Sequence, residues 1–309
     1  MNGNPQNPKV APAGRQPKQQ REWLVRIADY WTLTKPEVNF LVLISTLVGF
    51  CLAADGSIDG WLLFHTLMGT LLVASGTGTL NQYIERKTDA LMRRTSRRPL
   101  PGGRLSPAEA LWFGMFLSAA GGVELWLAAN PLTSLLALLT LATYLLFYTP
   151  LKKKTPLCTL VGAFPGAMPP LIGWVAVRNG VSLEAGVLYA ILFLWQFPHL
   201  LAIAWMYRED YSRAGLQMLP RNDRDGSATV RQILGYTLAL VPVSLIPAFL
   251  GHAGFYYLAG AGMLGGGFLY YGARLASSRT NALAKQLLMA SIIYLPLVFG
   301  LLMADRSRF

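Results

Sequence analysis

The stretch EAGVLYAILFLWQFPHLLAIAWMY, at residues 184–207, decides the fold, because it is apolar over a length that can cross a lipid bilayer. Similar runs recur along the chain, which is 53% hydrophobic and only 14% charged, with a mean hydropathy of +0.39. A soluble helical bundle would give each helix a polar face, and most of these runs show none. The sequence therefore predicts an all-α, polytopic membrane protein.

Nine transmembrane helices are predicted from these runs. They are expected at residues 38–54, 61–82, 108–128, 132–149, 157–177, 184–207, 232–250, 253–273 and 284–303. Residues 1–22 are rich in Pro, Gln, Asn and basic residues and lack an apolar core, so we expect a disordered basic tail there. Residues 23–309 are expected to form one transmembrane domain, whose first part, residues 23–37, is amphipathic and suits the headgroup region.

The basic residues test this count of helices independently. If the tail is cytoplasmic, the cytoplasmic segments carry 24 of the 27 Lys and Arg residues, and only Arg178, Arg306 and Arg308 fall outside. The positive-inside rule describes this asymmetry. We therefore expect a bacterial-type inner (plasma) membrane protein with a cytoplasmic N-terminus and an external C-terminus. Topology explains the net charge of +12, and no nucleic-acid partner is expected.

The segment NQYIERKTDALMRRTSRRPLP, at residues 81–101, concentrates charge at the predicted cytoplasmic end of the second helix. Asn81, Glu85, Asp89 and Arg93 recur every four residues, so on a helix they form one stripe about 18 Å long. Two carboxylates on one face repel each other, unless a hard divalent cation binds between them. The stripe therefore predicts a Mg²⁺ site, and the Arg and Lys residues around it suit a diphosphate.

Two further clusters are expected to face this stripe from the cytoplasmic side. Asp210 follows the sixth helix, and His199 lies eleven residues earlier on nearly the same face, about 16 Å deeper along the axis. A solitary intramembrane His is usually a hydrogen-bonded group between helices, so a structural and a functional role both stay open for His199. Between the fourth and fifth helices, Lys152 and Lys153 either snorkel to the surface or close over the diphosphate, with Tyr148 supplying a hydroxyl group.

These motifs resemble those of a known family. The pattern Asn81-x-x-x-Glu85-x-x-x-Asp89, with the acidic end of the sixth helix, resembles the intramembrane aromatic prenyltransferase (UbiA-type) superfamily. The resemblance to the haem-farnesylating branch of this superfamily is carried by residues 89–101, 148–153, 166–174, 198–199 and 210–220. It extends from about residue 29 to the last helix.

The resemblance implies nine helices in two halves around a central cavity open to the cytoplasmic side. It implies transfer of a farnesyl group from farnesyl diphosphate to a vinyl group of haem B, with addition of water, to give haem O. The residues that it assigns to Mg²⁺ are Asn81, Glu85, Asp89 and Asp210. Those assigned to the diphosphate are Arg93, Arg94, Lys152, Lys153 and Tyr148. His199 would bind haem B, by iron ligation or hydrogen bonding, or would position the water; assembly factors of terminal oxidases are candidate partners.

Two alternatives stay open from the sequence. A sister enzyme of the same superfamily would prenylate an aromatic acid or a quinone precursor; it would more often carry Asp where this chain has Gln82, and would lack the pair Pro198-His199. A membrane haem carrier or transporter would place charges along a path through the membrane. Here the carboxylates gather at one predicted membrane face, which favours an interfacial catalytic site.

Overall fold

The computed structural model describes residues 18–306 except 55, 221, 222 and 224. Within this part the chain is helical, with turns and one isolated bridge between Ala253 and Arg306. The helices are α1 (Lys18–Leu33), α2 (Pro36–Ala53), α3 (Gly60–Asp89), α4 (Pro107–Ala128), α5 (Pro131–Thr143), the π-helix η1 (Tyr144–Tyr148), α6 (Thr149–Leu151), α7 (Cys158–Gly166), α8 (Met168–Arg178), α9 (Leu183–Met206), α10 (Arg208–Arg213), α11 (Ser227–Phe249), α12 (Phe255–Ser278) and α13 (Asn281–Ala304). Residues 1–17 of the predicted tail lie outside the described residues, whereas residues 18–22, which were predicted to belong to the tail, form the start of α1.

Eight helical segments in the described part are long and apolar enough to cross a membrane. They are Pro36–Ala53, Gly60–Asp89, Pro107–Ala128, Pro131–Leu151, Cys158–Arg178, Leu183–Met206, Ser227–Phe249 and Asn281–Ala304. The protein is therefore an integral membrane protein with several transmembrane helices. The predicted count of nine is not confirmed, because α12 is not one of these eight segments. This helix is as long as its neighbours but contains many glycines and tyrosines.

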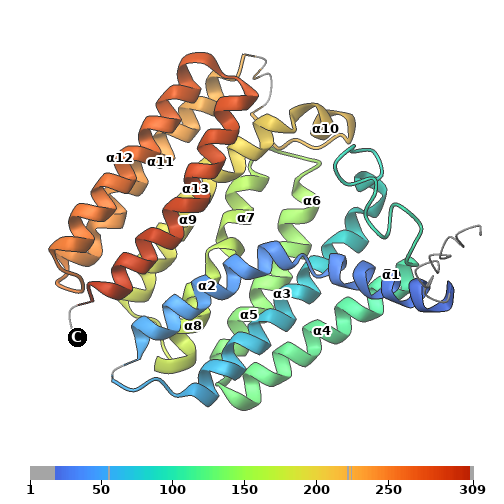
Figure 1. The fold of residues 1–309 in the computed structure, drawn as a ribbon, viewed down its shortest axis with the longest axis horizontal. Helices are drawn as coiled ribbons and strands as arrows, with labels where there is room; N and C mark the ends of the chain where they lie inside the picture. Colours follow the sequence, from blue (N-terminus) through green and yellow to red (C-terminus); the bar gives the residue numbers. More distant parts are fainter. Residues whose placement is uncertain (1–17, 55, 221–222, 224, 307–309) are drawn as a thin grey trace, which may run out of the picture.

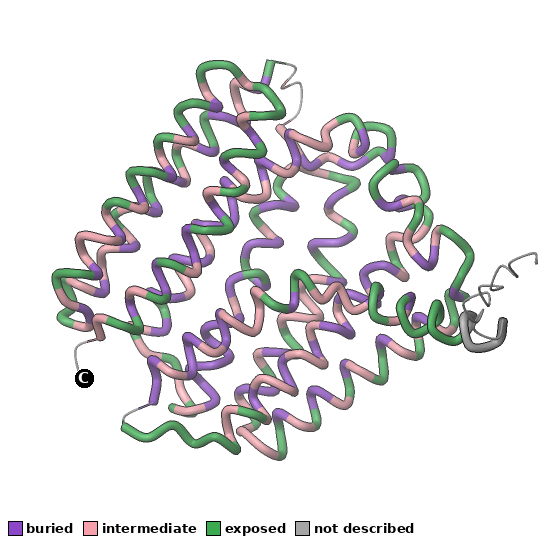
Figure 2. The backbone as a smooth tube through the Cα atoms, in the orientation of Figure 1, coloured by how far each residue is buried: buried purple, intermediate pink, exposed green. Residues whose placement is uncertain are grey.

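The bundle has two halves, as the family resemblance implied (Figure 1). In one half, α3 packs on α4, α2 packs on α8, and α5 packs on α4 and α8. In the other, α11 lies between α9 and α12, and α13 packs against both α9 and α12. The halves meet where α9 contacts α7 and α8 and where α13 contacts α2. Buried positions follow these interfaces (Figure 2).

Side chains fix where the long helices begin. The Asp59 carboxylate accepts hydrogen bonds from the backbone N–H groups of Trp61 and Leu62 at the start of α3. Ser106 and Glu109 form a capping box at the start of α4. Such caps satisfy amide groups that hydrocarbon could not.

The segment predicted as the fifth helix, residues 157–177, contains several glycines and prolines and is irregular. It divides into α7 and α8 at Ala167, and α8 approaches α2 backbone to backbone. A Cβ atom added to Gly173 would lie 2.0 Å from the carbonyl oxygen of Thr46, and one added to Gly49 would lie 1.9 Å from that of Pro170. Only glycine permits this approach between transmembrane helices.

Gly173→Ala is therefore expected to lower the free energy of unfolding by about 1–3 kcal/mol, the usual effect of overpacking. Gly267→Ala is a matched control, because a Cβ there meets nothing within 4 Å. Thermal unfolding of both variants in the same detergent checks this. Equal melting temperatures would contradict the packing argument.

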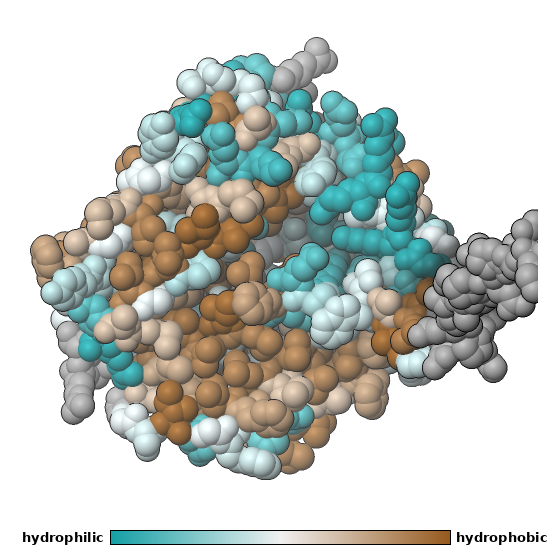
Figure 3. Space-filling model, viewed as in Figure 1, coloured by the Kyte–Doolittle hydropathy of each residue, from teal (hydrophilic) through white to brown (hydrophobic). Residues whose placement is uncertain are grey.

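The surface separates polar from apolar residues. Figure 3 shows hydrophilic residues gathered on one side of the face in view, beside a hollow near its centre, while apolar residues cover much of the remainder. The hydrophilic side includes the segments that follow α3 and α9, and these segments carry part of the predicted site.

Candidate active site

Asn81 lies at the buried centre of the site, and both ends of its amide are engaged. Lys35 Nζ donates to Asn81 Oδ1 at 2.7 Å, and Asn81 Nδ2 donates to Thr149 Oγ1 at 3.2 Å. The Thr149 hydroxyl donates its own hydrogen to the carbonyl of Tyr144, at the start of the π-helical turn. Thr149 therefore serves as an acceptor for Asn81 and holds the amide oxygen toward Lys35.

Lys35 was not among the predicted site residues, because residues 23–37 were predicted to lie in the headgroup region. It adopts a left-handed backbone conformation, with φ of 54°, between α1 and α2. Gln82 holds this turn, because its Nε2 donates to the carbonyls of Thr32 and Leu33. Neither the buried Lys nor its turn has a sequence signal, since the stretch resembles an ordinary interfacial segment.

The pKa of Lys35 is lowered to about 7, chiefly by burial and also by the nearby positive charge of Arg98, although the Glu85 carboxylate acts in the opposite direction. A bound anion would oppose both effects and favour the charged ammonium. Binding of an anion is therefore expected to raise the fraction of Lys35 side chains that are protonated.

Glu85 and Lys152 form the central ion pair, with 2.9 Å between Oε1 and Nζ, and both side chains are largely buried. The Lys152 ammonium also lies 4.4 Å from the ring centroid of Tyr148. Burial alone would lower the pKa of Lys152, but Tyr148 and Glu85 hold it well above its ordinary value. The structure thus brings together three of the predicted residues, with Lys152 fully charged at neutral pH.

Asp89 is the last residue of α3 and is almost fully buried. Its Oδ2 accepts from Arg98 Nη1 at 2.8 Å, and its backbone carbonyl accepts from Thr95 Oγ1. The expectation that Arg93 continues the helical stripe is wrong, because α3 ends at Asp89 and the chain turns. Arg98 takes the contact, and the four-residue spacing could not indicate this.

Asp210 joins the other half of the bundle to this loop, as predicted. The backbone N–H of Arg94 donates to its Oδ2 at 3.3 Å, and Arg213 donates to its Oδ1 at 2.9 Å. Burial would raise the pKa of Asp210, but these donors and the backbone N–H of Arg93 outweigh it and lower the pKa. Asp210 is therefore held in its ionised form by the N–H groups of three arginines.

The remaining predicted diphosphate ligands lie further out. Arg93 and Lys153 are exposed. The Arg94 guanidinium lies 4.7 Å from the ring centroid of Tyr207 and donates to the hydroxyl of Tyr211 at 3.4 Å. The arginine is thus held at the rim by aromatic residues of the second half.

The carboxylate and amide oxygens of the cluster suit a magnesium ion that takes part of its ligand shell from a substrate. No group of three or more His, Cys, Asp or Glu residues in the described part of the chain is placed to hold a metal ion by itself. Mg²⁺ in phosphate-transfer sites usually takes only one or two carboxylates and completes its shell with substrate phosphates and water. The carboxylate and amide oxygens present fit a magnesium ion that arrives with a diphosphate.

His199 stands apart from this cluster, within α9. Its Nδ1 lies 2.8 Å from Ser291 Oγ of α13, and its ring stacks on that of Trp195 at 4.7 Å between centroids. The structure therefore places His199 at the contact between α9 and α13, not among the carboxylates.

The structure is thus a bundle of membrane-spanning helices with acidic and basic residues clustered near the ends of α3, α6 and α9. The chain belongs to the UbiA prenyltransferase family, whose model matches residues 42–294. It is therefore a prenyltransferase.

Two of the most similar relatives have the same name. The chain is 52% identical over 288 residues to the protoheme IX farnesyltransferase of Solibacter usitatus, covering 90% of this chain and 98% of the relative. It is 44% identical over 291 residues to the enzyme of the same name from Koribacter versatilis, covering 91% and 94%.

Solved structures show the same fold. The structure described as digeranylgeranylglyceryl phosphate synthase matches with a TM-score of 0.74 at 18% identity, over 90% of this chain and 98% of that one. A UbiA homolog from Archaeoglobus fulgidus bound to GPP and Mg²⁺ matches with a TM-score of 0.62 at 16% identity, over 89% and 99%. At these identities the likeness concerns the fold alone.

Proposed function

We propose that this protein transfers the farnesyl group of farnesyl diphosphate to a vinyl group of haem B and adds water, giving haem O. The observation that carries the proposal is the end-to-end similarity to relatives named protoheme IX farnesyltransferase. The cluster around Glu85 and Lys152 supplies groups suited to the first half of this chemistry.

Mg²⁺ would be held at the carboxylate end of the cluster, where its charge would stabilise the departing diphosphate. The residues proposed to hold it are Asn81, Glu85, Asp89 and Asp210. Thr149 fixes the amide orientation that points the Asn81 oxygen into the cluster.

The cations of the cluster would bind the diphosphate as it leaves. Lys152 and Arg98 now engage carboxylates, and Lys35 engages Asn81. Such prealigned charges stabilise a leaving group because little reorganisation is needed. The exposed predicted ligands Arg93, Arg94 and Lys153 would act at the rim, and Tyr148 lies beneath Lys152.

The reaction balances with haem and water as the other reactants. The bond between farnesyl carbon and oxygen breaks with both electrons going to diphosphate. The vinyl group then forms the new carbon–carbon bond, and water adds to the resulting carbocation with loss of one proton. A dry, aromatic setting protects the allylic cation until the vinyl group attacks.

The proposal places the site on the cytoplasmic side of a bacterial-type inner membrane, with the N-terminus inside. The distribution of basic residues supports this orientation. The cavity between the halves would open on that side, and oxidase assembly factors would receive the haem O.

The proposal is tested with purified protein, farnesyl diphosphate, Mg²⁺ and haem B, measuring haem O by mass spectrometry. A panel of aromatic acceptors, including 4-hydroxybenzoate, runs alongside. Haem O formation that stops when Mg²⁺ is chelated is the expected result. Prenylation of 4-hydroxybenzoate without haem O would overturn the proposal in favour of a quinone-pathway enzyme.

A further inference from the structure

The hydrogen bonds around His199 specify the position of its proton. Ser291 Oγ lies 2.6 Å from the carbonyl oxygen of Leu288, one turn earlier in α13, and donates to it. Its single hydrogen is therefore used, so Ser291 must accept the hydrogen bond from His199, across 2.8 Å. Nδ1 consequently carries the ring proton, and Nε2 keeps a free lone pair.

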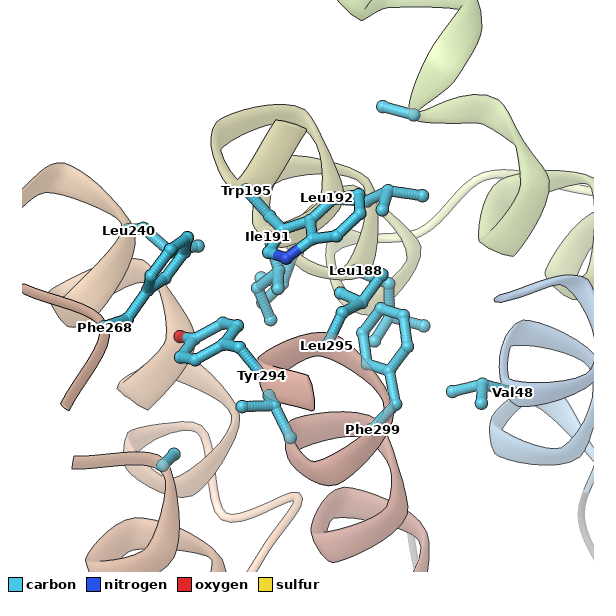
Figure 4. Close-up of a cluster of buried hydrophobic side chains, with 14 of the residues drawn as sticks. Val48, Leu188, Ile191, Leu192, Trp195, Leu240, Phe268, Tyr294, Leu295 and Phe299 are labelled. Atoms are coloured by element: carbon cyan, nitrogen blue, oxygen red, sulfur yellow. The ribbon is translucent and has the colours of Figure 1, made fainter. Parts of the chain in front are cut away.

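The ring is fixed in orientation as well as in tautomer. Trp195, one turn before His199 on α9, stacks on the imidazole with 25° between the planes. Its Nε1 donates to the backbone carbonyl of Ser291 at 2.8 Å. Figure 4 shows the Trp195 indole among Ile191 and Leu192, in the core that α13 shares. Trp195 and Ser291 therefore hold the imidazole from two sides.

Nε2 is left available. In the part of the chain that the structure describes, this atom makes no hydrogen bond. It is also not one of the fully buried polar atoms that lack a partner, so part of its surface is accessible. Histidines that bind metals usually donate the other ring N–H to an oxygen acceptor in this way. A lone pair at Nε2 can bind iron, whereas it cannot donate to a haem propionate.

We infer that Ser291 is a positioning residue, which fixes His199 as the Nδ1–H tautomer so that Nε2 ligates the iron of haem B. The inference rests on the proposed function and extends it. It names the bond that orients the acceptor, a choice that the sequence left open between iron ligation, hydrogen bonding and placement of water.

The test is binding of ferric haem B to the full-length protein in lipid nanodiscs, followed by absorption and electron paramagnetic resonance spectra, with no farnesyl diphosphate present. The wild type is expected to show the spectrum of an imidazole-ligated haem, and His199→Ala is expected to lose it. Ser291→Ala is expected to raise the dissociation constant of haem B about 10–100-fold, the usual effect of losing such a hydrogen-bond partner. Ser291→Thr, which keeps the hydroxyl, is expected to restore most of the affinity.

Two controls separate ligation from general damage. Iron-free protoporphyrin IX is expected to bind the wild type and Ser291→Ala equally, because it offers no iron. Ser244→Ala removes another buried serine, whose hydroxyl lies 2.8 Å from that of Tyr294, and is expected to leave haem affinity unchanged.

The outcomes for the two claims are distinct. Equal haem affinity and spectra for wild type and Ser291→Ala overturn the inference, as does an unchanged spectrum in His199→Ala. The His199→Ala comparison decides the ligation even if Ser291→Ala does not fold. Failure of the wild type to make haem O overturns the proposed function, whatever the spectra show.

Discussion

Asp89→Asn is expected to lower the rate of farnesyl transfer by about 10²–10³-fold, the usual loss when one preorganised charge is removed from an active site. Asp89 is buried at the end of α3, and its Oδ2 pairs with Arg98. The amide keeps the shape of the side chain but loses the negative charge that would hold Mg²⁺. The initial rate measured over a range of Mg²⁺ concentrations checks this, and more Mg²⁺ is expected to recover part of the loss.

Asp29→Asn is the matched control for this variant. Asp29 is also buried and is paired with Arg104 at 2.9 Å, but the pair joins α1 to the loop before α4 outside the cluster. Loss of its charge is expected to reduce stability without a comparable loss of rate. If both variants lose activity in proportion to their stability, Asp89 has only a structural role.

Lys152→Met is expected to reduce both stability and activity. It leaves Glu85 buried without its partner, and breaking a buried ion pair in this way costs about 3–5 kcal/mol. It also removes a cation from the proposed leaving-group site, at a further cost of about 10²–10³-fold in rate. Thermal unfolding and initial rates measure the two effects separately.

The double variant Glu85→Gln with Lys152→Met distinguishes these effects. Removing both charges is expected to return the melting temperature close to that of the wild type, because no unpaired charge remains. The rate is expected to stay low, because both of the charges proposed to act in catalysis are absent. A double variant that recovers its rate together with its stability would show that the pair serves the fold alone.

The sequence predicted the parts of this protein that depend on local patterns. Apolar runs placed eight of the membrane-crossing segments, and the four-residue spacing placed Asn81, Glu85 and Asp89 on one helix. The break between α7 and α8 also has a local cause, because glycines and prolines lie close together in that part of the chain.

Other features depended on contacts between distant segments. Lys35 enters the site because Gln82, from another helix, holds a left-handed turn, and Arg98 replaces Arg93 because the chain turns after Asp89. The partner of His199 lies 92 residues away on α13. Periodicity within a single helix carries no information about such pairs.

The pairing of each proposed magnesium ligand with a cation has a consequence for the order of events. If Mg²⁺ alone took Glu85, Lys152 would be left buried without a counter-ion; if diphosphate alone took Lys152, Glu85 would be stranded instead. Each ligand therefore removes the penalty that opposes the other, and this coupling must be reciprocal. We therefore expect the metal and the prenyl diphosphate to bind cooperatively, each raising the affinity of the site for the other.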